Sequence, residues 1–131
     1  MAKTKLFTIT LENRPGALAE VVRTLANAKV NILAVLGTTQ GTSGVIDLIV
    51  EDARRAKKAL ADAGRSYKET AAEAYELDNK PGALANYLAK LAARGVNLNS
   101  ICATVTKGAK KAVVVHTVTP QGGNTEPAAY F

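Results

Sequence analysis

Two six-residue segments of the chain share a pattern of asparagine, proline and glycine that leaves backbone hydrogen-bond donors exposed. Residues 13–18 read Asn-Arg-Pro-Gly-Ala-Leu, and residues 79–84 read Asn-Lys-Pro-Gly-Ala-Leu. A proline in the first turn of a helix is followed by N–H groups that have no partner inside the helix. These donors and the positive end of the helix dipole suit a carboxylate, and the glycine lets a ligand approach the backbone closely.

A second asparagine follows each predicted helix, where the next strand opens. Asn31 precedes Ile32 and Asn97 precedes Leu98. A side-chain amide offers an acceptor for an ammonium group as well as a donor. The combination predicts a site for a small zwitterion such as a free amino acid, whose side chain would lie against the leucines and isoleucine. The candidate ligand-binding residues are Asn13, Arg14, Pro15, Gly16, Ala17, Leu18, Asn31, Ile32, Asn79, Lys80, Pro81, Gly82, Ala83, Leu84, Asn97 and Leu98.

Each of these residues also has a purely structural interpretation. Pro-Gly is common turn chemistry, and Asn13 or Asn79 could hydrogen-bond only the nearby backbone as an Asx turn. The second pair of asparagines could cap or bridge strands, and the apolar residues could belong to the core. Arg14 and Lys80 are interpreted as solvent-exposed loop charges rather than ligand contacts.

Catalytic and metal-binding chemistry find little support in the sequence. His116 is the single histidine and stands among valines, and Cys102 is the single cysteine and is typical of a small buried hydrophobe. No serine–base motif, metal-ligand spacing or glycine-rich phosphate loop occurs. We therefore expect a protein that is not an enzyme and has no metal site or cofactor. A lone cysteine and the lack of a long apolar run predict a cytoplasmic location, without membrane attachment.

The charge balance permits weak attraction to nucleic acid but does not favour it. The chain has 131 residues with 17 Lys and Arg against 11 Asp and Glu, a formal net charge of +6. The basic residues are dispersed, and the predicted strands Val45–Val50 and Ala112–Val118 lack the aromatic residues on which RNA-binding modules stack bases. A ferredoxin-like RNA-binding or protein-interaction module without a small-molecule ligand remains the alternative function.

An internal repeat organises the whole chain. Residues 11–32 and 77–98 align at an offset of 66 without a gap, and 11 of the 22 aligned positions are identical. Such similarity indicates two copies of one structural unit.

Residue periodicity predicts the elements of each copy. Phe7, Ile9 and Leu11 alternate with polar residues as in a strand. A helix follows each proline, with apolar residues at the helical spacing i, i+3, i+4 and i+7: Leu18, Val21, Val22 and Leu25 in the first copy, and Leu84, Tyr87, Leu88 and Leu91 in the second. Strands are then expected over 30–38 and 45–50, and over 96–106 and 112–118. Gly95 suits the left-handed end of the second helix, whereas its counterpart Lys29 does not.

The two copies diverge after their third strand. The first continues into a helix that Asp52 can cap and Gly64 can end, and then into an extended stretch, residues 65–79, that serves both copies. The second copy lacks this helix and is a shortened βαββ unit. We expect the tail or another subunit to cover its open sheet edge.

The order of elements and the doubled strand–Asn-x-Pro-Gly-x-Leu–helix–Val-Asn signature resemble the ACT domain family. The resemblance covers residues 5–79 as a full module and 72–118 as a truncated one. It implies an α+β, ferredoxin-like βαββαβ fold repeated in tandem, with antiparallel sheets and helices on one face. The expected domains are residues 1–70, residues 71–119 and a C-terminal tail, residues 120–131.

By resemblance, the protein is an amino-acid-binding regulatory protein. ACT modules pair side by side and hold amino acids at the pairing interface, so a homo-oligomer, most simply a homodimer, is implied. Because no enzyme is attached, a partner enzyme or regulator would act in trans.

Overall fold

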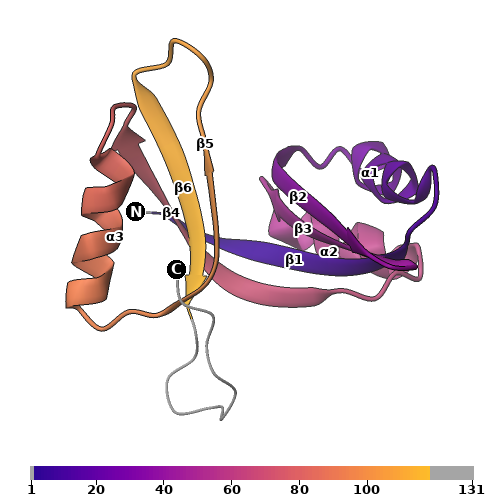
Figure 1. Cartoon of the computed structure of the whole chain (residues 1–131). Helices are drawn as coiled ribbons and strands as arrows, with labels where there is room; N and C mark the ends of the chain where they lie inside the picture. Colours follow the sequence, from indigo (N-terminus) through magenta and orange to yellow (C-terminus); the bar gives the residue numbers. More distant parts are fainter. Residues whose placement is uncertain (1, 119–131) are drawn as a thin grey trace. The chain divides into compact units, whose positions relative to one another are not determined.

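The computed structural model describes residues 2–118, which form two compact units (Figure 1). One unit comprises residues 4–71, and the other comprises residues 72–118 together with the first residues of the chain. The predicted tail, residues 120–131, lies outside the described residues, and so does the prediction that it covers a sheet edge. No helix in the described part is both long and apolar enough to cross a membrane.

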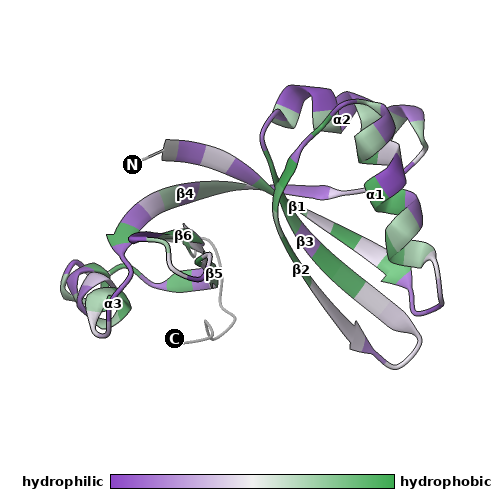
Figure 2. Cartoon of the chain, turned by 90° about the horizontal axis from the view of Figure 1, so that it is seen from above, coloured by the Kyte–Doolittle hydropathy of each residue, from purple (hydrophilic) through white to green (hydrophobic). Residues whose placement is uncertain are grey.

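The N-terminal unit is a complete βαββαβ module. Its elements are β1 (Ala2–Glu12), α1 (Ala17–Asn27), β2 (Ile32–Gln40), β3 (Ser43–Val50), α2 (Ala53–Asp62) and the beginning of β4 (Lys68–Asp78). The strands lie in the order β2-β3-β1-β4, and β3 is antiparallel to both β1 and β2. Both helices cover the same face of this sheet (Figure 2).

The core of this unit lies between the sheet and the two helices. Alternate residues of β1 and β3 point to the helices, and every fourth residue of α1 points back. The buried cluster contains Phe7, Ile9, Leu11, Ala17, Val21, Leu25, Val30, Ile46, Leu48, Val50, Ala56 and Leu60. Asp52 caps α2 by accepting a hydrogen bond from the backbone N–H of Arg55, as the sequence predicted.

The C-terminal unit is a βαββ unit with a single helix among the described residues. The remainder of β4 is followed by α3 (Ala83–Ala93), β5 (Leu98–Thr104) and β6 (Lys111–Val118). The strand order is β4-β6-β5, with Tyr75 opposite Val114 and Cys102 opposite Val115. The predicted α+β class, the βαββαβ order and the helices on one face are confirmed, and β4 is the shared strand.

The predicted helix stripe is confirmed at Val21 and Leu25 but not at its first position, Leu18. On α1 the buried residues are Ala17, Val21 and Leu25, whereas Leu18 is 41% exposed. The corresponding Leu84 on α3 is 40% exposed. These two leucines are therefore surface residues at the helix openings rather than core residues.

Lys29 supports the prediction that the first helix ends at a strained residue. Its φ is +63°, in the left-handed region, where its counterpart Gly95 has φ +73°. A non-glycine residue there costs about 1 kcal/mol or more. Lys29→Gly should raise the free energy of unfolding by about 0.5–1 kcal/mol, since relief of the strain exceeds the added flexibility of the unfolded chain. Urea titration checks this, and Gly95→Lys should give a loss of similar size; a stabilised Gly95→Lys variant would contradict the explanation.

Candidate functional site

Both copied loops begin their helices with a left-handed glycine. Gly16 has φ +86° and ψ −12°, and Gly82 has φ +90° and ψ −16°. No heavy atom beyond the neighbouring residues would lie within 4 Å of a Cβ at either position, so the backbone conformation and not crowding requires glycine. The open space also leaves the loop backbone accessible from solvent.

The loops retain some of the unpaired donors that the sequence predicted. The N–H of Ala17 donates to the carbonyl of Arg14 at 3.3 Å, and that of Ala83 donates to Lys80 at the same distance. Within residues 2–118, no protein acceptor meets the N–H groups of the glycine and leucine on either side of each alanine. Each loop therefore offers two unpaired donors where three were expected.

The first asparagine of each loop ties it to the hairpin turn next to it. The Nδ2 group of Asn13 donates to the carbonyl of Gly41 at 2.9 Å, and that of Asn79 donates to Ala109 at 2.8 Å. The main-chain N–H groups of both asparagines bond the same turns. These side-chain N–H donors are thus engaged within the protein, and the Oδ1 atoms are the groups left for a ligand.

The basic residues of the two loops differ in their surroundings. The Arg14 guanidinium pairs with Glu12 and with Glu20, both at 3.0 Å. The hydrogen bond from Arg14 lowers the pKa of Glu20, and the bond to Glu20 raises the pKa of Arg14. Lys80 forms no ion pair within 4 Å among the described residues: Asn86 stands at the position of Glu20, and Asp78, the counterpart of Glu12, pairs with Lys111 instead. Lys80 acts on Asp78 only at longer range and helps to lower the pKa of Asp78, after the larger effect of Lys111.

A cavity of about 170 Å³ lies beside the second loop. Asn79, Lys80, Ala83 and Leu84 line one side, and the ends of β5 and β6 line the other, including Val105 and Val113. Both valines are exposed to solvent, at 46% and 38%. The hollow therefore combines an apolar wall with Lys80 and Leu84 of the loop, and Asp78, which pairs with Lys111, also lines it. In the N-terminal unit, a hollow of about 430 Å³ lies instead at residues 8–10 and 64–68, away from the first loop.

The second pair of asparagines lies at the opposite end of each unit. Asn31 and Asn97 follow helices of 11 residues, which span roughly 16 Å. The Nδ2 group of Asn31 donates to Glu51 at 3.2 Å. Ile32 is partly buried and Leu98 is 6% exposed, so both serve mainly as packing residues. A single unit therefore does not bring its loop and its later asparagine together.

An aromatic cluster in the C-terminal unit was not predicted. The rings of Tyr75 and His116 stack with centroids 5.9 Å apart, and the Tyr87 hydroxyl hydrogen-bonds His116 Nε2 at 2.5 Å. His116 is 2% exposed, and its Nδ1 has no partner in the described part of the chain. The one signal in the sequence was alternation, which places His116 on the same face of β6 as Val114.

Comparison with known proteins identifies a family. The model of the ACT domain matches residues 5–64. The crystal structure of protein BT0572 from Bacteroides thetaiotaomicron is similar at 31% identity and a TM-score of 0.82, over 90% of this chain and 81% of that chain. Comparison with characterised proteins gave no significant match.

Regulatory subunits of aspartate kinase share the fold. The ligand-free subunit from Thermus thermophilus is similar at a TM-score of 0.67 and 16% identity, over 89% of this chain and 84% of that chain. The subunit from Thermus flavus is similar at a TM-score of 0.56 and 18% identity, over 88% of this chain and 82% of that chain. At these identities, the likeness concerns the fold alone.

Proposed function

Since the chain belongs to the ACT domain family, we propose that it is a regulatory protein that binds a small amino acid at its second copied loop, residues 79–84. The observation that carries the proposal is the cavity beside this loop, with Lys80 unpaired and Leu84 exposed at its edge. The ligand carboxylate would accept hydrogen bonds from the amides of Gly82 and Leu84, at the positive end of α3. The apolar wall favours a small or branched aliphatic side chain.

The ammonium group of such a ligand needs several acceptors. Within the unit, the carboxylate of Asp78 and the Oδ1 atom of Asn79 lie at the cavity, and a further acceptor would complete the surroundings of the ammonium group. We infer that Asn97 or Asn31 of another unit supplies it, most simply within a homodimer. The likeness of the fold to aspartate kinase regulatory subunits supports a regulatory role without catalysis. The regulated enzyme would then be a separate protein.

A melting screen with the common amino acids tests this function. A ligand at roughly a hundredfold excess over its Kd stabilises the folded state by about 2.7 kcal/mol, which shifts the melting temperature by about 10 °C. Leu84→Trp should abolish this shift, because the larger ring fills the cavity mouth. The exposed position of Leu84 lets the variant fold.

Leu18→Trp is the matched control, because Leu18 is the equivalent residue and equally exposed. It should leave the ligand-dependent shift unchanged. Loss of the shift in Leu18→Trp alone would move the site to the first loop. If no amino acid raises the melting temperature of the unsubstituted chain, and none is carried through purification, the proposed function is wrong.

A further inference from the structure

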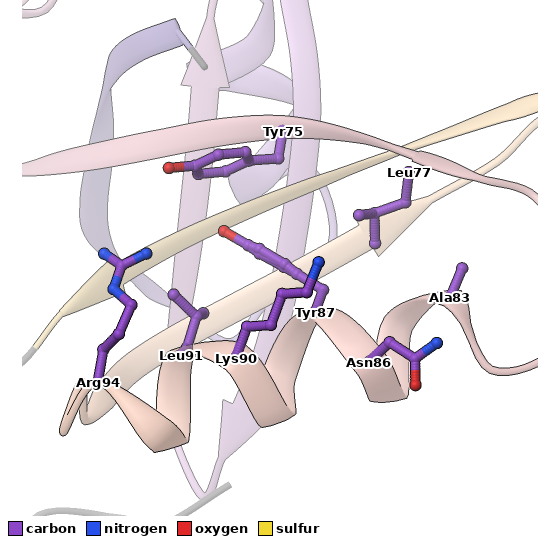
Figure 3. Close-up of a pocket in the computed structure, with 8 residues that line it drawn as sticks. All are labelled: Tyr75, Leu77, Ala83, Asn86, Tyr87, Lys90, Leu91 and Arg94. Atoms are coloured by element: carbon purple, nitrogen blue, oxygen red, sulfur yellow. The ribbon is translucent and has the colours of Figure 1, made fainter.

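A second hollow of the C-terminal unit combines aromatic and cationic side chains and runs along α3 from Ala83 to Arg94. It has a volume of about 290 Å³ and lies between β4 and α3. Figure 3 shows Tyr75 and Leu77 on the strand facing Tyr87 and Leu91 on the helix, with Lys90 and Arg94 extending from the helix towards the strand. Its volume is close to the lower limit of ligand pockets.

The repeat explains why a hollow exists here. At the offset of 66, Tyr75, Tyr87 and Leu91 correspond to Ile9, Val21 and Leu25. Those three residues are 1%, 0% and 0% exposed, in the cluster that also contains Ala56 and Leu60 of α2. No helix follows β6 within residues 2–118, so no described helix takes the place of α2 on the equivalent face of the C-terminal unit.

The residues on this face are more aromatic and more basic than their counterparts in the N-terminal unit. Aliphatic Ile9 and Val21 are replaced by tyrosines, whose rings meet edge to face with centroids 5.0 Å apart. Such rings provide an apolar surface suited to a further aromatic ring in an offset or edge-on arrangement. Thr24 and Ala28 are replaced by Lys90 and Arg94.

Two cations at i and i+4 on one helix repel each other and are mildly destabilising. Neither Lys90 nor Arg94 forms an ion pair within the described part of the chain. The acid on this face is Glu73, opposite His116 in the strand register, and it pairs with neither cation. An anion at the rim of the hollow would relieve this repulsion.

We propose that this cavity binds an aromatic carboxylate, with the ring against Tyr75, Tyr87 and Leu77 and the carboxylate on Lys90 and Arg94. Guanidinium and ammonium donors form the stronger, charge-assisted class of hydrogen bond with a carboxylate. A ligand without an ammonium group suits the site, because an ammonium would lie beside the two cations. The two cavities share Leu77 and Ala83, but Tyr75, Tyr87, Lys90 and Arg94 line this one and not the cavity beside the loop, so the proposal does not depend on the proposed function.

Indole-3-acetate is a direct probe, because the chain contains no tryptophan. Its indole fluorescence can be excited beyond the tyrosine band, and its anisotropy rises on binding. The full chain should show saturable binding, and Lys90→Gln/Arg94→Gln should weaken it by roughly tenfold or more. The neutral analogue indole-3-acetamide should bind the unsubstituted chain about as weakly as indole-3-acetate binds the double variant.

Lys107→Gln/Lys110→Gln is the matched control, because it removes two exposed charges away from the cavity. Unchanged affinity in this control supports the site, whereas an equal loss shows general attraction to a basic protein and overturns the proposal. Absence of saturable binding also overturns it.

Discussion

Phe7→Ala should lower the free energy of unfolding by about 3–5 kcal/mol. Phe7 is fully buried in the centre of β1, and its ring meets that of Tyr67 edge to face with centroids 5.5 Å apart. Removing the ring leaves a cavity between the sheet and the two helices that rigid neighbours fill only in part. Since domains are stable by about 5–15 kcal/mol in total, this single change removes a large share.

Urea unfolding of the N-terminal unit, followed by circular dichroism, measures the effect through the transition midpoint. The dependence of the free energy on urea should stay unchanged if the variant keeps the same two states. Leu33→Ala serves as the control, because Leu33 is also a large apolar residue but is 57% exposed. It should change the free energy by less than about 0.5 kcal/mol. A loss in Phe7→Ala no larger than in this control would show that the centre of β1 does not carry the core.

Acidification should destabilise the C-terminal unit through His116. Burial lowers the pKa of His116 below its ordinary value of 6.5, although the carboxylate of Glu73 opposes this shift. The unfolded chain therefore takes up the proton first. The free energy of unfolding is unaffected well above pH 6.5 and falls as the pH drops through 6.5 towards the lower folded pKa.

At alkaline pH, the curve of unfolding free energy against pH should have a second falling limb. Its cause is Tyr87, the hydrogen-bonded partner of His116. Burial, and the nearby Tyr75 and Glu73, raise the pKa of Tyr87 from 10 to about 12. The folded state keeps this proton longer than the unfolded chain, so the free energy of unfolding falls as the pH rises from 10 to 12. Stability should therefore be greatest between these two limbs.

Melting temperatures measured across this range test the assignment. His116→Gln should flatten the acid limb between pH 5 and 7 while keeping the alkaline limb, and Tyr87→Phe should do the reverse. Asp78 and Glu20, whose pKa values are lowered by Lys111 and Arg14, act only at lower pH. An acid limb that persists unchanged in His116→Gln would assign it to another group.

The main features of the fold could be predicted from the sequence because they depend on local periodicity and on the repeat. The alternation through Phe7, Ile9 and Leu11 and the cap at Asp52 are both local signals, and both are confirmed. The helix stripe is confirmed at Val21 and Leu25 and was wrong at Leu18, which is 41% exposed. Leu18 lies in the first turn of α1, and the apolar spacing alone does not show that Ala17 takes the buried position there.

The site was harder to predict because it depends on contacts between distant segments. The hydrogen bond from Asn13 to Gly41 joins residues 28 apart, and no sequence pattern distinguishes it from a ligand contact. The position of Asn97 at the far end of α3 could be predicted, because the length of this helix follows from the residue pattern. The pairing of Tyr87 with His116 needs the register of α3 on β6, and residue spacing alone does not provide it.

The C-terminal unit has no counterpart of α2 within residues 2–118, which has a consequence for how the two copies could diverge. A polar side chain buried beneath a helix needs a hydrogen-bond partner inside the protein, whereas one at a cavity rim can end in a hydroxyl, guanidinium or carboxylate that water solvates. The counterparts of Phe7, Ile9 and Ala28 are Glu73, Tyr75 and Arg94. The N-terminal copy thus keeps an apolar core, and the C-terminal copy carries polar and charged side chains at the equivalent positions of the same elements.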